Sequence, residues 1–300
     1  MAQRYNVRLT QLVSSVFLVV LFGWYGSAKS VLDRFITVDD LRVHYIEVGN
    51  GPTIVMIHGN AGSVADFNFG AVDLLSSCYR VVAVDRPGHG RSDRGSTKAS
   101  VEVQAELLHH VLSSLGIDKP SLVGHSWGAA LALAYALKYP HEVSGLVLLA
   151  PAAYPDETGN NLLAAIARTP VIGDLSVAIG KTVLGRRLLE RGLAMAFFPE
   201  RVPDPYLKLA YSLWLSRKRV KAYVEDESSL NFSLNKMSKH YAEIRIPVVI
   251  VTGDRDQIVS PAQNAYTLHA TLPQSQLIEI KDTGHEIPLT HPESIATALT

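Results

Sequence analysis

The chain has 300 residues, of which 47% are hydrophobic and 19% charged, and its 28 basic side chains equal its 28 acidic ones. This balance creates no field that would attract a polyanion, so no nucleic-acid partner is expected, while the length and apolar content suffice for a large buried core. The single cysteine, Cys78, excludes an internal disulfide framework and a multi-cysteine metal site. We expect its small side chain to be buried.

The N-terminal segment has the length and apolarity of a membrane-spanning helix. Residues 9–28 contain no charged side chain, and about 20 such residues cross a bilayer core. Two arginines precede them, which predicts a cytoplasmic N-terminus with the rest of the chain outside the cytoplasm, in the periplasm for a bacterium with two membranes. Trp24 and Tyr25 are typical of a membrane interface and favour an uncleaved anchor. The alternative is a signal peptide cleaved near Ala28, which would release a secreted protein.

From residue 32 onward, strand patterns alternate with helix patterns. Residues 34–49 predict two short strands joined at Asp39-Asp40, and the β-branched run at 53–59 is typical of a strand buried on both faces. The alternation predicts a doubly wound α/β fold with a mostly parallel sheet. Further strands are predicted at 80–85, 121–126, 145–151, 247–253 and 276–282, and helices at 63–76, 99–115, 127–139, from Pro261 and from His291.

One long block interrupts this alternation. Residues 152–241 carry apolar helical patterns punctuated by prolines and glycines, with 13 basic and 9 acidic side chains. Because the block is inserted between two strands, we expect a helical cap over the carboxyl edge of the sheet. The predicted organisation is a membrane or signal segment at 1–31, a first core part at 32–151, the cap at 152–241 and a second core part at 242–300.

Unusual residues follow several predicted strands. In an open parallel sheet, functional groups gather in the loops beyond the carboxyl ends of the strands. These loops contain His58-Gly59-Asn60, Arg86-Pro87-Gly88-His89-Gly90-Arg91-Ser92, Gly124-His125-Ser126-Trp127-Gly128, Gly253-Asp254-Arg255-Asp256 and Gly284-His285.

This ordered set of motifs resembles the α/β-hydrolase superfamily over the whole chain after the N-terminal segment. Each motif alone is weak to moderate evidence for this family. Together, in this order and each after a strand, the motifs are strong evidence. The resemblance implies an inserted cap and a catalytic triad of Ser126 as nucleophile, Asp256 as acid and His285 as base. It also implies an oxyanion hole formed by the backbone N–H groups of Asn60 and Trp127.

The residues around Ser126 fit that role chemically. A Gly-x-Ser-x-Gly turn strains the serine backbone, so its neighbours must be small, as Gly124 and Gly128 are. The turn would place the hydroxyl at the N-terminus of the 127–139 helix, where the helix dipole favours a developing negative charge.

A serine hydroxyl needs a base, and the chain contains 11 histidines. His285 stands where the family base is found, whereas His58 and His125 are expected to brace their loops. The acid could be Asp254 or Asp256. The resembling pattern places it three residues after the glycine, which favours Asp256.

Several alternatives share these motifs. Haloalkane dehalogenases and epoxide hydrolases need aspartate at the position of Ser126, so the serine indicates acyl chemistry. Prolyl aminopeptidases also carry a Ser-Trp-Gly turn, so a prolyl-type aminopeptidase or amidase is an alternative. Residues 225–227, Glu-Asp-Glu, could bind an amino group, although such a run is more often a solvated helix face. Cofactor-free haloperoxidases share the triad. The non-enzyme alternative is a membrane-tethered binding protein on a hydrolase fold.

We therefore expect a serine hydrolase that cleaves a lipophilic carboxylic ester through an acyl-enzyme, with a small-molecule ester and the membrane as its partners. No metal or nucleotide motif occurs, so no cofactor is expected. Aromatic side chains of the cap could line an apolar pocket, or could equally pack the cap's own core: Phe197, Phe198, Tyr206, Tyr211, Trp214 and Tyr223.

Overall fold

The computed structural model describes residues 32–95, 100–156, 183–214 and 217–300. The predicted membrane or signal segment at 9–28 therefore lies outside the described residues. Within the described ranges, no helix combines the length and the apolarity needed to cross a membrane.

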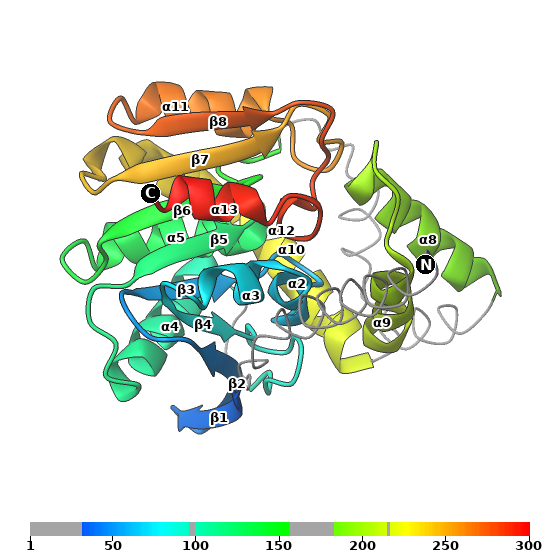
Figure 1. The fold of residues 1–300 in the computed structure, drawn as a ribbon, viewed down its shortest axis with the longest axis horizontal. Coiled ribbons are helices and arrows are strands. Elements are labelled where there is room, and N and C mark those ends of the chain that lie inside the picture. The colour runs from blue at the N-terminus through cyan, green and yellow to red at the C-terminus, as the bar shows by residue number, and fades with distance from the viewer. Residues whose placement is uncertain (1–31, 96–99, 157–182, 215–216) are drawn as a thin grey trace, which may run out of the picture. The chain divides into compact units, whose positions relative to one another are not determined.

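An eight-stranded sheet lies at the centre of residues 32–300 (Figure 1). Its order is β1-β2-β4-β3-β5-β6-β7-β8, with β2 antiparallel to both neighbours and the other neighbouring pairs parallel. The predicted α/β fold with a mostly parallel sheet is confirmed. The strands are β1 (Leu32–Val38), β2 (Leu41–Val48), β3 (Thr53–Ile57), β4 (Arg80–Val84), β5 (Ser121–His125), β6 (Gly145–Leu149), β7 (Val248–Gly253) and β8 (Gln276–Ile280).

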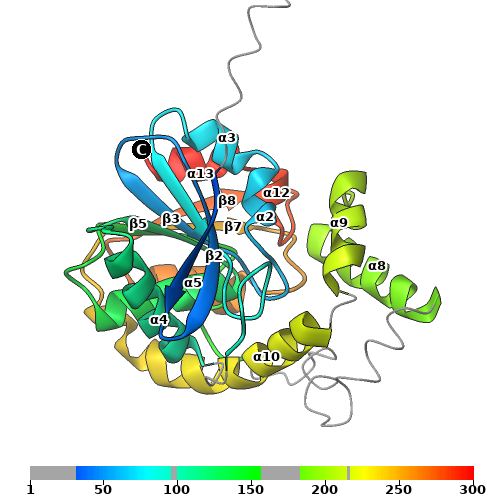
Figure 2. The ribbon, with the colours of Figure 1, turned by 90° about the horizontal axis from the view of Figure 1, so that it is seen from below.

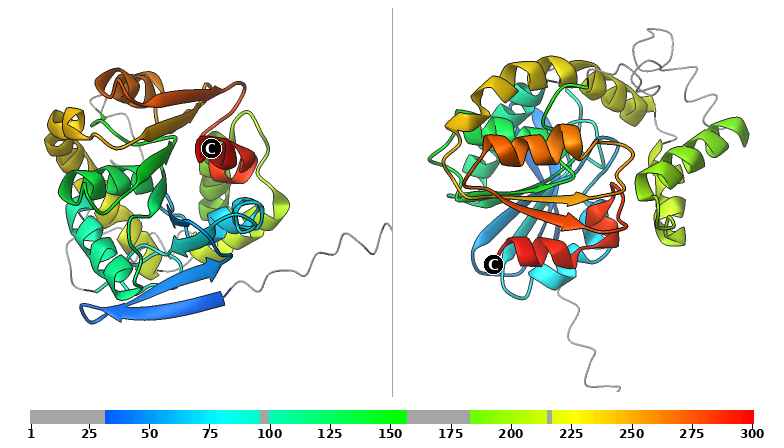
Figure 3. Two further views of the ribbon diagram at one scale, coloured as in Figure 1. Left: turned by 60° about the vertical axis from the view of Figure 1, so that its left-hand side comes forward. Right: turned by 90° about the horizontal axis from the view of Figure 1, so that it is seen from above.

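Helices cover both faces of the sheet (Figures 2 and 3). Successive side chains of a strand point to opposite faces, so Val55 and Ile57 of β3 join one apolar cluster, while Ile54 and Met56 join the other. One face carries α4 (Val101–Ser114), α5 (Trp127–Lys138), the π-helix Ala262–Tyr266 and α11 (Thr267–Thr271), and the other carries α2 (Ala65–Asn68), α3 (Ala71–Leu75) and α13 (Glu293–Ala298). A short helix, α12 (Ile287–Thr290), precedes α13.

Two local expectations differ from the structure. The predicted helix 63–76 is divided into α2 and α3, because Gly70 between them adopts φ 154°, a conformation that interrupts a helix. Cys78 is exposed rather than buried, since it lies in the turn that leads from α3 into β4.

The described part of the insertion is helical. It consists of α8 (Val183–Phe197), α9 (Asp204–Trp214) and α10 (Arg217–Met237), followed by a 3-10 helix at Ser238–Glu243. Phe197 and Tyr206 belong to a separate apolar cluster in which cap residues pack with Leu289 of α12, whereas Leu234 and Met237 near the end of α10 pack into the main core. The cap is tied to the core through α10, and also through hydrogen bonds such as those of Tyr206 to Asp66 and of the His285 N–H to the Ala196 carbonyl.

Candidate active site

Ser126 occupies a sharp turn between β5 and α5. Its backbone has φ 53° and ψ −115°, a conformation that non-glycine residues rarely adopt and that clusters at functional sites. The Ser126 N–H donates to the Leu149 carbonyl at 2.9 Å, and the Ser126 carbonyl accepts from the Ala129 N–H at 3.0 Å. The turn is therefore fixed between β6 and the start of α5.

The glycines around Ser126 are required by close packing. A Cβ atom on Gly124 would lie 2.5 Å from the Gly128 oxygen, and one on Gly128 would lie 2.2 Å from the Ile57 oxygen. A Cβ atom on Gly59, in the loop after β3, would lie 3.2 Å from Cβ of Ser126. Backbone from β3, β5 and α5 thus meets at the serine with no room for intervening side chains.

His285 and Asp256 come from the loops after β8 and β7 and meet in a buried pair. His285 Nδ1 lies 2.7 Å from Asp256 Oδ2. The second oxygen of Asp256 accepts from the backbone N–H groups of Ile258 at 2.8 Å and Val259 at 2.9 Å. Because the ionised carboxylate is only an acceptor, Nδ1 carries the proton and Nε2 of the neutral ring remains to accept one.

The geometry distinguishes the two candidate acids. Asp254 makes no hydrogen bond to His285 within the described ranges; its carboxylate instead lies 3.6 Å from Lys281 Nζ. Burial opposes the charged form of His285, but the charge of Asp256 and its hydrogen bond outweigh burial and raise the pKa of His285 above 6.5. The structure thus brings Asp256, rather than Asp254, to the predicted base.

His125, directly before Ser126, braces the base. Its Nε2–H donates to the His285 carbonyl at 3.0 Å, and the two rings are 4.8 Å apart between centroids. Burial, reinforced by the charge of His285, lowers the pKa of His125 to about 3, so this ring is neutral. No hydrogen bond joins Ser126 Oγ to His285 among the described residues, as is common in structures without substrate.

The two predicted oxyanion donors flank Ser126. The Trp127 N–H lies in the first turn of α5, where helical N–H groups have no acceptor within the helix. The Asn60 N–H follows Gly59, on which a Cβ atom would lie 3.2 Å from Cβ of Ser126, and it makes no hydrogen bond within the described part of the chain. Both groups are therefore available to an oxyanion formed beside the serine.

His58 is a structural residue of this loop. The Arg86 backbone N–H donates to His58 Nε2 at 2.9 Å, so the proton of the neutral ring is on Nδ1, which bonds to the Gly59 carbonyl at 2.8 Å. Burial, with the charge of Arg86, places the pKa of His58 well below 6.5.

A buried polar network beside the site was not predicted from the sequence. Asp226 of α10 is completely buried and pairs with Arg86 at 2.6 Å, with His89 at 3.0 Å and with Gln104 at 3.1 Å. Its interpretation as part of a solvated helix face is therefore wrong. Asp226 and Arg86 are 140 residues apart, and no local pattern indicates such a contact.

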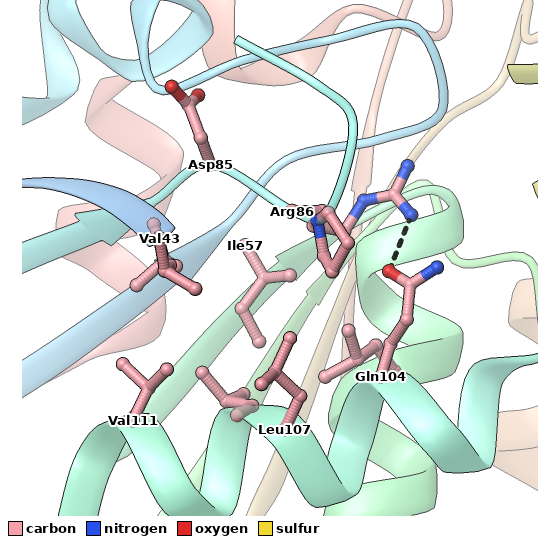
Figure 4. Close-up of a pocket in the computed structure, with 11 residues that line it drawn as sticks. Val43, Ile57, Asp85, Arg86, Gln104, Leu107 and Val111 are labelled. Atoms are coloured by element: carbon pink, nitrogen blue, oxygen red, sulfur yellow. Dashed lines mark hydrogen bonds between the residues drawn. The ribbon is translucent and has the colours of Figure 1, made fainter. Parts of the chain in front are cut away.

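Figure 4 shows a small, mostly apolar cavity next to Arg86, where its guanidinium bonds to Gln104. Val43, Ile57 and Val111 are among its lining residues, whereas no member of the predicted triad is. We therefore do not assign this cavity to the reacting substrate. Within the described ranges, no group of three or more histidine, cysteine or acidic side chains is arranged to hold a metal ion.

The aromatic side chains of the cap lie in different environments. Phe197 and Tyr206 are buried in the cluster that joins the cap to Leu289 of α12, and Phe198 is 44% exposed. Tyr211 bonds to Glu190, the Tyr223 carbonyl accepts from Asn60 Nδ2, and the side chain of Trp214 lies outside the described ones. Phe197 and Tyr206 thus support packing of the cap against the core, where the Tyr206 hydroxyl donates to Asp66 at 3.3 Å, rather than a substrate pocket.

An open α/β sheet that holds a strained serine turn at the end of one strand and a paired histidine and aspartate after two others defines the class of α/β hydrolases. The chain belongs to the alpha/beta hydrolase fold family, whose sequence model matches residues 52–292.

Several relatives of the chain are hydrolases, and solved structures of other proteins share its fold. The 2-hydroxy-6-oxononadienedioate/2-hydroxy-6-oxononatrienedioate hydrolase of Klebsiella pneumoniae is 30% identical over 290 residues, which cover 91% of this chain and 96% of that protein. The crystal structure of Cfl2 from Burkholderia cenocepacia is 28% identical with a TM-score of 0.76, over 89% of this chain and 94% of that one. A thermophilic esterase from Thermogutta terrifontis shares the fold, with 21% identity and a TM-score of 0.72, over 89% of this chain and 96% of that one.

Proposed function

We propose that the protein is a serine hydrolase that cleaves carboxylic esters through an acyl-enzyme. The observation that carries the proposal is the strained turn at Ser126 together with the 2.7 Å contact between His285 and Asp256. Each part corresponds to one requirement of acyl transfer, namely a presented nucleophile, a base to accept its proton and an acid to orient that base.

The reaction runs in two halves. His285 Nε2 accepts the proton of Ser126 Oγ as the oxygen attacks the ester carbonyl, and Asp256 stabilises the imidazolium that forms. The backbone N–H groups of Asn60 and Trp127 donate to the oxyanion, and His285 then protonates the departing alkoxide. Water, activated by the same histidine, hydrolyses the acyl-serine and restores the enzyme.

A second candidate is cleavage of a carbon–carbon bond in a 2-hydroxy-6-oxo dienedioate. It is supported by the hydrolase of Klebsiella pneumoniae that is 30% identical to this chain. Such a diacid needs cationic partners, and both Arg86 and Arg94 are already paired with Asp226, at 2.6 and 2.8 Å. These two arginines are therefore engaged within the protein rather than by a substrate carboxylate.

Amide cleavage with recognition of a free amine is less well supported. Of the acidic run on α10, Asp226 is engaged by Arg86, and Glu225 pairs with Arg94 at 3.0 Å. Glu227 accepts from Asn60 Nδ2 at 3.0 Å. No carboxylate of the run is thus left without a partner to receive an ammonium group.

Attachment to a membrane would give the enzyme access to a lipophilic ester, which is the proposed substrate. It is supported by the uncharged segment 9–28 and by the basic excess of residues 152–241. Under this proposal the N-terminus is cytoplasmic and the catalytic part lies outside the cytoplasm, still attached to the membrane or released after cleavage near Ala28. Sedimentation of the full chain with the membrane fraction, and its release by detergent rather than by high salt, tests the attachment.

A substrate panel tests the proposed reaction. The full chain is assayed against p-nitrophenyl esters of increasing acyl length, a prolyl-naphthylamide and a 2-hydroxy-6-oxo dienedioate, with Ser126→Ala as the control. We expect ester turnover that is lost in the variant. Preferred turnover of the naphthylamide or the dienedioate would replace the ester assignment, and undiminished turnover by the variant would contradict the mechanism.

A further inference from the structure

The loop that carries the Asn60 N–H is held by a buried arginine. Arg86 donates from Nε to the His58 carbonyl and from Nη2 to the Gly59 carbonyl, both at 3.1 Å. Its guanidinium carbon also lies 4.0 Å from the centroid of the Trp127 ring. One side chain thus contacts both segments that supply the oxyanion donors.

The contact with Gly59 determines where the Asn60 N–H points. The Gly59 carbonyl and the Asn60 N–H belong to one peptide group, which is trans, so the two bonds point in opposite directions. The carbonyl accepts from Arg86, from His58 Nδ1 at 2.8 Å and from the Gly62 N–H at 3.3 Å. With the oxygen anchored in this way, the N–H is directed away from Arg86, and the peptide is polarised so that its N–H becomes a stronger donor.

The cap holds this arginine in place. Asp226 of α10 bonds to Arg86 Nη1 at 2.6 Å, and the Asp226 carbonyl accepts from Trp127 Nε1 at 3.4 Å. Burial opposes ionisation of Asp226, but the charge of Arg86 and the hydrogen bond from His89 lower its pKa well below the ordinary value. A carboxylate of the cap thereby balances the buried charge that anchors the loop.

We propose that Arg86 is a positioning residue for the oxyanion hole, and that Asp226 couples the cap helix to this hole through it. The inference rests on the proposed function, because it assumes an oxyanion beside Ser126. It assigns to the cap an effect on the rate of the chemical step, in addition to any effect on substrate binding.

The test uses Arg86→Lys, which keeps a positive charge beside Asp226 but loses the planar fork that reaches two carbonyls. Asp226→Asn is the second variant. Ser233→Ala is the matched control, because Ser233 is a buried residue of α10 that bonds to Glu102 of α4 at 2.8 Å without contacting the loop. Ester turnover is expressed per active site, as titrated by a fluorophosphonate, so that misfolded protein is not counted.

We expect Arg86→Lys and Asp226→Asn to lower kcat per titrated site about 10-fold to 100-fold. Their KM should stay within about 2-fold of the wild-type value, because the lost interaction acts in the transition state. The inhibition constant of a trifluoromethyl ketone, which forms a tetrahedral adduct, should rise in proportion to the loss. Ser233→Ala should leave kcat and this inhibition constant unchanged.

The outcomes separate this inference from the proposed function. An esterase whose Arg86→Lys variant keeps its kcat per titrated site overturns the inference alone. If Arg86→Lys yields no titratable sites, the kcat per titrated site of Asp226→Asn decides instead, and an unchanged value overturns the inference. A wild-type chain that turns over no ester overturns the proposed function, and the inference with it.

Discussion

The pKa of His285 sets the pH range in which Ser126 can be activated. The ring must be neutral to accept the serine proton, and its pKa is raised above 6.5 because Asp256 outweighs the effect of burial. We therefore expect kcat/KM to fall as the pH is lowered through a single pKa that lies above 6.5. A pH–rate profile for a neutral ester checks this, and an apparent pKa below 6.5 would contradict it.

Replacing either aspartate of the loop after β7 distinguishes their roles. Asp256→Asn should lower kcat about 10⁴-fold, since the amide favours the wrong tautomer of His285. The kcat of Asp254→Asn should stay within about 3-fold of the wild-type value, because the Asp254 carboxylate faces Lys281 instead of His285. Steady-state kinetics of both variants decide the assignment. A large loss of kcat confined to Asp254→Asn would instead identify Asp254 as the acid.

At the scale of elements, the junction of β5 and α5 is the most constrained part of the site. Gly124→Ala would place a methyl group 2.5 Å from the Gly128 oxygen and 2.7 Å from Cα of Ala129, so backbone must move. We expect Tm to fall by more than about 5 °C, together with a loss of activity. Calorimetry measures the shift.

Gly192→Ala is the matched control for that junction. A Cβ atom on Gly192, within α8, would meet nothing within 4 Å, and alanine favours helices by about 1 kcal/mol over glycine. Its Tm should be unchanged or slightly higher. An equal fall in Tm in Gly124→Ala and Gly192→Ala would show that the junction of β5 and α5 is not specially constrained.

The elements could be predicted from the sequence wherever a local pattern determines them. The β-branched runs identified the central strands, and motif order placed Asp256 and His285 on loops that the structure brings together. Local patterns failed where conformation or long-range contact decides. The unusual φ of Gly70 divides a predicted helix, and the buried Asp226 pairs with Arg86, which lies 140 residues away along the chain.

For the whole molecule, a buried histidine outside the site links stability to pH. The two ring nitrogens of His44 face the carboxylates of Asp85, at 2.6 Å from Nδ1, and of Asp33, which also pairs with Arg91. Burial opposes the charged ring, but the two carboxylates outweigh it and raise the pKa of His44 above 6.5. The fold thus favours the charged form of the His44 ring more than water does.

A raised pKa in the folded state stabilises the protein below the unfolded pKa, and this stabilisation is lost as the pH rises through the folded pKa. The difference in free energy of unfolding between wild type and His44→Gln should therefore shrink between about pH 6 and about pH 9. Urea unfolding at both pH values measures it. A difference that grows with pH would contradict a raised pKa of His44 in the fold.

The proposal that Ser126 is the catalytic nucleophile is tested most directly by trapping the acyl-enzyme intermediate. The full chain is mixed with a p-nitrophenyl ester, quenched in acid during the burst of nitrophenol release, and digested for mass spectrometry. We predict the mass of one acyl group on the peptide that contains Ser126, and neither adduct nor turnover in Ser126→Ala. An acyl group on another residue, or full turnover by Ser126→Ala, would contradict the account.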